Sequence, residues 1–370
     1  MRIGIPRESK EGERRVGLDP KAVAVLAGDG HDLRVASGAG HGIGATDEAY
    51  RAAGARIVDA AEAWRAQLVV KVKEIQQDEW PGLEPDSTIF CFHHLAGEPG
   101  RARGVADRGV TAIAFEMVRD DAGGFPLLAP MSVIAGRLAI QVGAQLLTLP
   151  AGGNGTLLAG CPGAEPARVL VLGGGHAGSQ AARLALAMGA AVTVLTRSAH
   201  TRDALARLLG EAVVAGLATP EAIERHALAA DLVVGAVFIP GAPTPKLLPR
   251  ALVSRMKPGS VIVDVSIDAG GVAETSRPTT HANPTFVEEG VVHYCVANMP
   301  SAVARAGSAA LSSAALPLVR TLAGQGIAQA IRGDPGLRAG VLLWRGRFTH
   351  EGIAAESGRP CLPLADGDLA

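Results

Sequence analysis

One glycine-rich segment near the middle of the chain constrains the fold more than any other feature. It reads ARVLVLGGGHAGSQAARLALAMGAAVTVLTR over residues 167–197, so an apolar strand leads through spaced glycines into an apolar helix. This order is typical of a dinucleotide-binding βαβ unit in a parallel sheet. A Cβ in the loop would keep a pyrophosphate away from the N–H groups at the helix N-terminus. The predicted cofactor contacts in this loop are Gly173, Gly175, His176, Ala177 and Gly178.

A second glycine-rich loop competes for the same role. The segment LRVASGAGHGIGATDEAYRAAGARIVD, residues 33–59, places Gly40-x-Gly42-x-x-Ala45 after a strand, and Asp59 supplies an acidic residue further on. Its candidate helix has only about eight residues, which is short for a crossover packed on a sheet. We therefore interpret this loop as a tight strand-to-helix connection and assign the dinucleotide to residues 173–178.

The end of the second strand in the central βαβ unit indicates which dinucleotide binds. An acidic residue there would accept a hydrogen bond from the 2′-hydroxyl of NAD(H), but the sequence has Thr196, Arg197 and Ser198 instead. Two hydroxyls and a guanidinium suit a 2′-phosphate, which Arg can bind through two hydrogen bonds. We therefore favour NADP(H) over NAD(H). The alternative is a polar turn that faces solvent.

Strands and helices alternate along the rest of the chain, which predicts an α/β fold with parallel sheets and crossover helices. Helices are predicted to begin at Asp19-Pro20, to span Ser132–Leu147, and to make up the tail from about Ala304. The predicted strands are Arg2–Ile5, Leu33–Ala36, Arg56–Val58, Leu68–Lys73, Ile89–His94, Val110–Phe115, Val169–Leu172, Ala191–Thr196, Asp231–Val237, Ser260–Ile267 and Val292–Val296.

Composition narrows the class of protein. With 370 residues the chain is long enough for two domains, and 35 Lys+Arg against 36 Asp+Glu give a net charge of −1. Such a balance offers no basic field, so we expect neither nucleic acid nor a membrane surface as a partner. Four scattered cysteines and ten scattered histidines favour a reduced, cytoplasmic protein without a metal site. The uncharged stretch Leu138–Ala164 is broken by PAGGNG, so it is not predicted to span a membrane.

Motifs spread along the whole chain resemble one family. In order they are RIGIPRESKEGERRVGLDP, VVKVKE, FHHLA, FE at 115–116, PLLAPMSVIAGRLA, the central glycine loop, GAVFIPGAP, MKPGSVIVDVSIDAGG, SRPTT and CVANMP. Together they are similar to the alanine dehydrogenase/transhydrogenase α-subunit family. The resemblance implies reversible NAD(P)-dependent oxidative deamination of L-alanine to pyruvate and ammonia.

The resemblance also implies an architecture. Two Rossmann-like domains with parallel sheets are expected, and the dinucleotide-binding domain, residues 129–304, is inserted in a discontinuous substrate domain, residues 1–128 and 305–370. The family commonly assembles as homo-oligomers, in particular hexamers. The expected partners are therefore a small oxo acid or amino acid, ammonia, and further copies of the chain.

Site residues follow from the resemblance, position by position. Arg15 and Lys73 match the substrate-binding pair, and His94 and Asp268 match the two proton-transfer groups. The remaining expected cofactor contacts are Ser132, Val237, Phe238, Ile267, Arg277, Asn298 and Met299.

Elementary chemistry agrees with these roles and leaves plainer alternatives open. A 2-oxo acid needs cations for its carboxylate and carbonyl oxygen, which Arg15 and Lys73 supply, and imidazole moves protons near neutral pH. Without the family, Arg15 reads as a surface charge, Lys73 as an exposed strand end and His94 as a histidine bonded to the backbone. Asp268 equally reads as a turn acid. Lys71 is predicted to share a strand face with Lys73.

Three departures from the family keep other functions open. Thr196-Arg197 replaces the usual acidic residue, His176 stands in the glycine loop, and AGSAALSSAALP, centred on Ser312-Ser313, replaces a T-N-A-T-like stretch. An NADPH-dependent imine or opine-type reductase acting on a different oxo acid or imine is the first alternative. A transhydrogenase α-like NAD-binding subunit and an inactive binding or sensing protein are the others.

Overall fold

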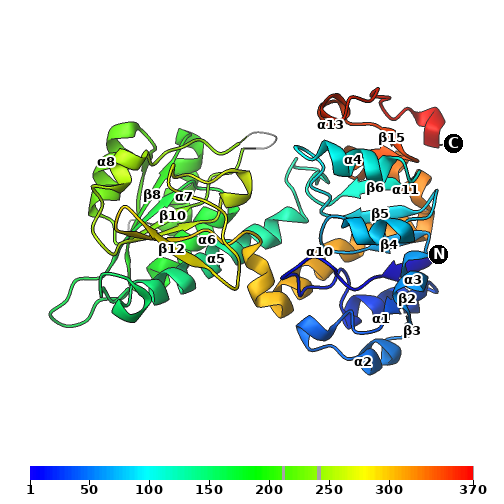
Figure 1. The fold of residues 1–370 in the computed structure, drawn as a ribbon, viewed down its shortest axis with the longest axis horizontal. Helices are drawn as coiled ribbons and strands as arrows, with labels where there is room; N and C mark the ends of the chain where they lie inside the picture. The colour runs from blue at the N-terminus through cyan, green and yellow to red at the C-terminus, as the bar shows by residue number, and fades with distance from the viewer. Residues whose placement is uncertain (211–212, 240–242, 370) are drawn as a thin grey trace. The chain divides into compact units, whose positions relative to one another are not determined.

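The computed structural model describes residues 1–210, 213–239 and 243–369, so residues 240–242 of the GAVFIPGAP motif lie outside these ranges. The chain forms two compact units, which are treated separately below. Unit 1 comprises Met1–Met131 and Ser301–Ala370, and unit 2 comprises Ser132–Pro300. Each unit is built around its own sheet (Figure 1).

Unit 1 contains an eight-stranded sheet in the order β15-β14-β6-β5-β4-β1-β2-β3. The strands β1 to β6 pair in parallel, whereas β14 runs antiparallel to β6 and β15 antiparallel to β14. The strand order changes direction between β1 and β4, where ligands of open α/β sheets bind. The strands are β1 Arg2–Ile5, β2 Asp32–Ala36, β3 Arg56–Val58, β4 Leu68–Val70, β5 Thr88–Cys91, β6 Thr111–Ala114, β14 Val341–Trp344 and β15 Arg347–Phe348.

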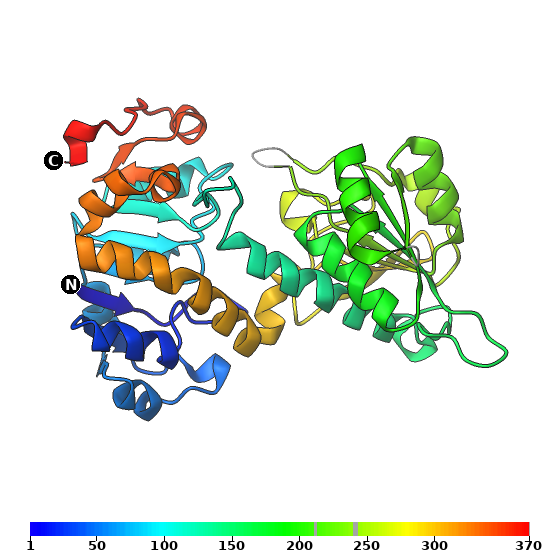
Figure 2. The ribbon, with the colours of Figure 1, turned by 180° about the vertical axis from the view of Figure 1, so that it is seen from behind.

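Helices cover both faces of this sheet. Figure 1 shows α3 and α4 in front of it, and Figure 2 shows α1 and α10 on the other face. The first helix begins where the sequence predicts, because the Asp19 side chain accepts a hydrogen bond from the Ala22 N–H and Pro20 opens the helix. The helices are α1 Pro20–Gly28, α2 Asp47–Ala52, α3 Ala60–Trp64, α4 Pro99–Ala106, α10 Ala304–Gln325, α11 Ile327–Gly333, α12 Pro335–Ala339 and α13 Glu351–Glu356, with 3₁₀ turns η1 His41–Ile43, η2 Gln77–Gly82, η5 Met299–Val303 and η6 Asp366–Leu369.

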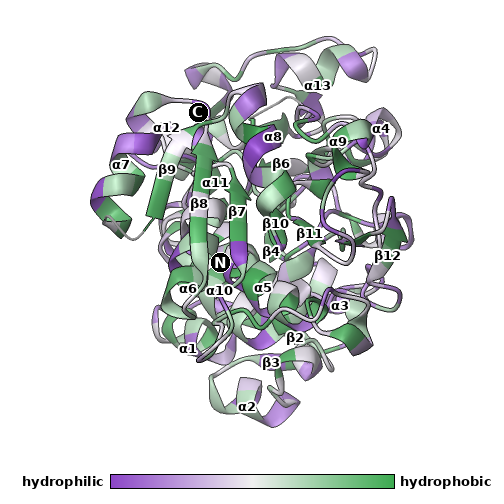
Figure 3. Ribbon diagram, turned by 90° about the vertical axis from the view of Figure 1, so that its left-hand side faces the viewer, coloured by the Kyte–Doolittle hydropathy of each residue, from purple (hydrophilic) through white to green (hydrophobic). Residues whose placement is uncertain are grey.

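Unit 2 contains a seven-stranded sheet in the order β12-β13-β11-β10-β7-β8-β9, with only β12 antiparallel among the described strands. Its central strands are mostly apolar, as the green colour that covers most of β7, β8 and β10 in Figure 3 shows. The strands are β7 Arg168–Leu172, β8 Ala191–Thr196, β9 Val213–Leu217, β10 Leu232–Gly235, β11 Val261–Asp264, β12 Thr285–Glu288 and β13 Val291–Tyr294. The helices are α5 Leu128–Leu146, α6 His176–Ala187, α7 Ala199–Leu209, α8 Pro220–Ala229 and α9 Arg250–Val253, with η3 Leu149–Ala151 and η4 Ile267–Ala269.

The prediction of a wholly helical tail is wrong. β14 is a buried apolar run of four residues that pairs with β6, the last strand of the parallel part of the sheet, and β15 returns beside β14. Four apolar residues are too few to show a period of two, so the sequence pattern did not separate this strand from the helices around it. The edge strands β9 and β12 were not predicted either.

One helical stretch, Met299–Gln325, is long and apolar enough to span a membrane by length and composition. Within unit 1 its helix α10 buries one face, which includes Leu311, Ala315 and Val319, and it contacts α1 and α11. A core helix of a water-soluble protein has the same properties, so length and composition alone do not indicate a membrane.

Candidate active site

The loops that follow four adjacent strands of unit 1 carry the polar residues of interest. Arg15 follows β1, Lys73 follows β4, His94 follows β5 and Glu116 follows β6. These strands are parallel, so their carboxyl ends lie along one edge of the sheet. Lys73 and His94 lie in loops because β4 and β5 end earlier than the sequence predicted, at Val70 and Cys91.

Arg15 is buried rather than on the surface, since only 3% of the residue is exposed. Its Nε and Nη2 donate to the two carboxylate oxygens of Glu13 at 2.8 and 2.6 Å. Its Nη1 lies 3.0 Å from Sδ of Met131. The surface-charge alternative is therefore wrong: a guanidinium this buried must be paired, and Glu13 pairs it.

Serine hydroxyls from the C-terminal segment hold the loop that carries Arg15. The Oγ of Ser301 accepts from the Arg14 N–H at 3.2 Å, and that of Ser308 accepts from the Val16 N–H at 2.9 Å. The Oγ of Ser312 accepts from the Asp19 N–H at 3.0 Å. Within the serine-rich stretch that departs from the family pattern, Ser308 and Ser312 thus bind backbone groups after Arg15, whereas Ser301, which precedes this stretch, binds the N–H group before it.

A pocket of about 280 Å³ adjoins Arg15 in unit 1. The first glycine loop, residues 38–42, forms one wall of the pocket and therefore lies close to Arg15, the candidate substrate-binding residue. The lining residues are Arg7, Glu8, Glu13, Arg14, Arg15, Gly38, Ala39, His41 and Gly42.

Lys73 points its ammonium at His94. Its Nζ lies 3.3 Å from Nε2 of His94, and the residue is 8% exposed. Glu8 fixes the backbone here, because its carboxylate accepts from the N–H groups of Val72 at 2.6 Å and of Lys73 at 3.3 Å. The site residues Lys73 and His94, predicted separately, are therefore in direct contact.

Lys71 does not share the surroundings of Lys73, as an extended strand would have required. It is fully buried, with its Nζ 3.2 Å from Glu8 and 3.0 Å from Glu79. Desolvation opposes its charge, but the two carboxylates outweigh this effect and raise the pKa of Lys71. Because β4 ends at Val70, both lysines lie after the strand, and their ammonium groups have different side-chain partners, Glu8 and Glu79 for Lys71 and His94 for Lys73.

His94 adopts a left-handed backbone conformation with φ of 45°, which is uncommon outside glycine. Its ring stacks on Phe92, with centroids 5.9 Å apart. Part of the ring faces solvent, yet desolvation by the surrounding side chains and, next, the charge of Lys73 lower the pKa of His94. An ammonium beside Nε2 favours the neutral ring with its proton on Nδ1.

Two carboxylates near this pair have opposite shifts. Burial disfavours the charged form of Glu74, but Lys73 and a hydrogen bond from Lys10 lower the pKa of Glu74 to about 2. Burial raises the pKa of Glu116 to about 7, although its hydrogen bonds from backbone N–H groups oppose the rise. Nearby cations therefore lower the pKa of one carboxyl group, Glu74, while burial raises that of the other, Glu116. Four glutamates near these residues were not predicted as part of the site: Glu8, Glu13, Glu74 and Glu116. Their position within the family motifs was the one sequence feature that could have indicated them.

In unit 2 the central glycine loop has the geometry of a phosphate cradle. Gly173 has a φ of 102°, and a Cβ on Gly178 would lie 1.8 Å from the carbonyl oxygen of Gly173. A Cβ on Gly175 would meet nothing within 4 Å among the described residues. The helix α6 begins with His176 and Ala177 directly after Gly175, and no described side chain caps it. The first N–H groups of α6 therefore lack a side-chain cap among the described residues, which is the feature that a phosphate-binding helix start requires.

The three predicted cofactor residues in the loop after β8 have different surroundings. Thr196 is buried, and a Cβ on Gly174 would lie 3.5 Å from its Cβ. Ser198 caps α7, because its Oγ accepts from the Thr201 N–H at 3.1 Å and donates to the Thr201 hydroxyl at 2.9 Å. Arg197 is exposed at the start of the same helix.

Asp268 lies in η4, directly after β11, with its side chain exposed. Asp264 holds this loop, since its carboxylate accepts from the N–H groups of Ser266 at 3.1 Å and Val272 at 2.8 Å. The Ser266 hydroxyl lies 2.8 Å from both the N–H and the carbonyl oxygen of Val237. The loops after β10 and β11 are therefore tied together beside the glycine loop after β7.

The other expected cofactor contacts lie elsewhere in unit 2. Ile267 and Met299 are buried, Ser132 opens the unit within α5, and Phe238 is 61% exposed. Asn298 has a φ of 62° and follows β13. The guanidinium of Arg277 lies 4.0 Å from the ring centroid of Phe286, which in turn stacks on His293 at 4.9 Å.

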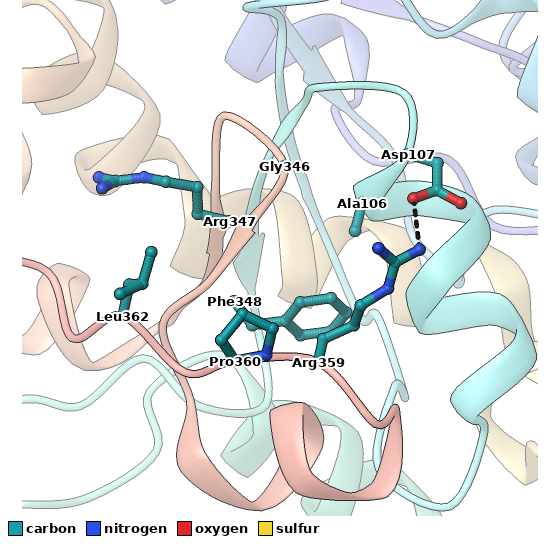
Figure 4. A pocket seen from close by; sticks show the side chains of 8 residues that line it. All are labelled: Ala106, Asp107, Gly346, Arg347, Phe348, Arg359, Pro360 and Leu362. Carbon is teal, nitrogen blue, oxygen red and sulfur yellow. Dashed lines mark hydrogen bonds and ion pairs between the residues drawn. The ribbon is translucent and has the colours of Figure 1, made fainter.

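Another pocket of unit 1, shown in Figure 4, lies at the amino end of β6, where Ala106 and Asp107 precede the strand. Arg359 closes one side through an ion pair with Asp107 at 3.0 Å. The candidate site lies at the carboxyl ends of the strands, so this pocket is not part of it. Within the described residues, no three His, Cys, Asp or Glu side chains are grouped to hold a metal ion.

Comparison with known proteins shows the family to which this chain belongs. The model for the alanine dehydrogenase/PNT N-terminal domain matches residues 4–135, and that for the alanine dehydrogenase/PNT C-terminal domain matches residues 139–351. An alanine dehydrogenase of Halomonas elongata is 47% identical over 360 residues, 97% of each chain. An alanine dehydrogenase of Bacillus subtilis is 43% identical over 365 residues, 98% of this chain and 96% of that one. The chain belongs to the alanine dehydrogenase/PNT family, which confirms the resemblance.

Solved structures confirm the α/β fold of two Rossmann-like domains. A structure of L-alanine dehydrogenase superposes with a TM-score of 0.93 at 41% identity, covering 96% of this chain and 98% of that one. A transhydrogenase from Sinorhizobium meliloti superposes with a TM-score of 0.83 at 24% identity and shows the same fold.

Proposed function

We propose that the protein is an NAD(P)-dependent amino-acid dehydrogenase that interconverts L-alanine with pyruvate and ammonia. One observation of the structure carries the proposal most directly, namely the contact between Nζ of Lys73 and Nε2 of His94 at the carboxyl ends of parallel strands. The relatives named alanine dehydrogenase, at 43–47% identity over nearly the whole chain, support the same reaction. The imine or opine-type reductase and the transhydrogenase-like subunit are not favoured.

The residues of unit 1 bind the oxo acid in this proposal. Arg15 attracts the substrate carboxylate, and Lys73 polarises the carbonyl oxygen as a compact positive charge. His94 takes and returns a proton at Nε2, which is unprotonated in the neutral ring. The carboxylate of Glu74 offsets the positive charge of Lys73 and Lys10, which lower its pKa well below the usual value.

The residues of unit 2 fit a nicotinamide dinucleotide. The open space at Gly175 and the uncapped start of α6 among the described residues suit the pyrophosphate. When bound, this cofactor supplies or accepts the hydride. Asp268, exposed on η4, assists the loss of water when ammonia has added to the carbonyl carbon. Ser132, Val237, Arg277 and Asn298 are proposed contacts of the same cofactor.

NADP(H) is the preferred cofactor in this proposal. Arg197 is exposed at the N-terminus of α7, where the helix dipole and the guanidinium both attract a 2′-phosphate. The Ser198 hydroxyl is used by its cap hydrogen bonds, so the preference rests on Arg197 and the helix rather than on all three residues. We also propose that the protein is cytoplasmic and forms a homo-oligomer, which the family resemblance suggests is a hexamer.

The test supplies pyruvate and ammonium with NADH and NADPH in parallel and follows the oxidation of the reduced cofactor. The proposal predicts turnover, and a larger kcat/KM for NADPH than for NADH. Larger oxo acids and cyclic imines serve as comparison substrates. If the enzyme turns over one of these comparison substrates but not pyruvate, the proposed enzyme class is right and the proposed substrate is wrong.

A further inference from the structure

Glu116 has no role in the reaction proposed above, yet it contacts the backbone of the proton-transfer residue. Its Oε1 accepts from the N–H groups of both His93, at 3.1 Å, and His94, at 2.7 Å. Its Oε2 lies 3.2 Å from the same His93 nitrogen. One carboxylate therefore binds two successive N–H groups where the chain leaves β5.

The sheet places this carboxylate firmly. β5 and β6 are parallel with Cys91 opposite Ala114, and the Phe115 N–H continues the pairing by donating to the Cys91 carbonyl oxygen at 2.8 Å. The Phe115 ring packs edge-on against Phe90 at 4.4 Å and Phe92 at 5.2 Å. Glu116 therefore extends from a packed strand end and not from a mobile loop.

The residue that it holds is in a costly conformation. A non-glycine residue with φ of 45° loses about 1–2 kcal/mol relative to the right-handed region. Both peptide groups of His94 are tethered, because its N–H donates to Glu116 and its carbonyl oxygen accepts from Nη1 of Arg101 at 3.2 Å. Without the tethers, the strain favours a relaxed backbone that turns the imidazole away from Lys73.

We propose that Glu116 is a positioning residue for His94, whose backbone it holds in the left-handed conformation that directs Nε2 toward Lys73. The reaction served by this role rests on the proposed function. The positioning itself does not, since it concerns a contact within unit 1.

The primary test replaces Glu116 with Met, which keeps the length of the side chain and removes the acceptors. We expect kcat to fall by about 100-fold, the loss that ångström-scale misplacement of a reacting group causes. The KM for pyruvate and the Kd for reduced cofactor should stay within about twofold of wild type, since Arg15 and unit 2 are untouched. In Glu116→Gln the amide oxygen can still accept from both N–H groups, so kcat should stay within about threefold of wild type.

A matched control removes the same kind of contact elsewhere in unit 1. Oδ1 of Asp120 also accepts from two backbone N–H groups, those of Ala122 at 3.0 Å and Gly124 at 2.7 Å. Asp120→Leu should leave kcat unchanged. If it lowers kcat as much as Glu116→Met does, general loosening of unit 1 explains the loss and the proposal is overturned.

A readout without substrate separates this proposal from the proposed function. In protein labelled with ¹⁵N-histidine, the ring signals of His94 are assigned by their disappearance in His94→Asn. We expect Nε2 to give the shift of an unprotonated nitrogen in wild type and Glu116→Gln, and an averaged shift of both tautomers in Glu116→Met. An unchanged spectrum in Glu116→Met overturns the positioning role. Absence of turnover with pyruvate in wild type overturns the function instead.

If Glu116→Met does not fold, Arg101→Met tests the other tether. It removes the donor to the His94 carbonyl oxygen and leaves Glu116 in place. We expect a partial, about tenfold, fall in kcat and the same direction of change in the His94 ring signals. Wild-type kcat and an unchanged spectrum would show that His94 keeps its backbone conformation without this contact, which contradicts the proposal.

Discussion

The loop after β2 and the loop after β7 have the same glycine spacing but use their backbone N–H groups differently. After β2, the N–H groups of residues 38, 39, 41, 43, 44 and 45 all donate within the loop or to Asp47. The turn closes into the three-residue η1 instead of a helix. After β7, the chain passes from Gly175 directly into the twelve-residue α6.

The glycines differ in the same way. In the first loop a Cβ on Gly40 would lie 2.6 Å from the Ala45 carbonyl oxygen and 2.7 Å from the Tyr50 ring, so glycine is required by packing. In the second loop Gly178 is also required by packing, but the space at Gly175 is open among the described residues. We therefore expect the phosphate on the second loop, where a helix follows directly and Gly175 leaves open space.

The largest effect is expected from a change that spares both loops. His94→Asn removes the proposed proton-transfer group of unit 1 and should lower kcat by about 10³-fold, within the range usual for general acid–base groups. Cofactor binding by unit 2 should be unchanged in a fluorescence titration of NADPH. Joint loss of turnover and cofactor affinity would assign His94 a folding role.

Gly40→Ala should break the first loop without touching the cofactor. The added Cβ must displace the Ala45 carbonyl or the buried Tyr50 ring, so we expect the protein to lose about 1–3 kcal/mol of stability. Chemical denaturation measures the loss. The Kd for NADPH of the folded protein should equal that of wild type, and a tenfold weaker Kd would mean that the first loop contacts the dinucleotide.

Arg197→Glu tests whether the loop after β8 binds the 2′-phosphate, and it has the smallest expected effect. A carboxylate at this exposed position repels a 2′-phosphate, so the ratio of kcat/KM for NADPH to that for NADH should fall by about tenfold or more, or roughly 1.4 kcal/mol. Parallel initial rates with the two cofactors measure this ratio. An unchanged ratio contradicts the assignment of the phosphate to Arg197.

Much of the fold could be predicted because its elements carry strong local signals. The Asp19-Pro20 helix start and the apolar run before Gly173 are read directly from residue type and spacing. The strand β14 could not be predicted in this way, because a four-residue apolar run forms a strand only when an edge such as β6 is available.

The sequence predicts candidate site residues but not the contacts that they make. Arg15 looks like a surface charge in the sequence, and its burial depends on Glu13, two residues away, and on serines almost 300 positions later in the chain. The left-handed conformation of His94 and its tether to Glu116 depend on the pairing of β5 with β6. Such contacts between distant segments leave no local signal in one sequence.

The most direct test of the difference between the loops is an equilibrium titration of NADPH on Gly175→Val beside wild type. Valine fits the extended backbone at this position, and its Cβ meets no described atom within 4 Å, so the fold and melting temperature should be kept. The side chain fills the space assigned to the pyrophosphate, so we expect the Kd to rise at least tenfold, by about 1.4 kcal/mol. A folded Gly175→Val protein that binds NADPH as tightly as wild type would contradict the placement of the dinucleotide on this loop.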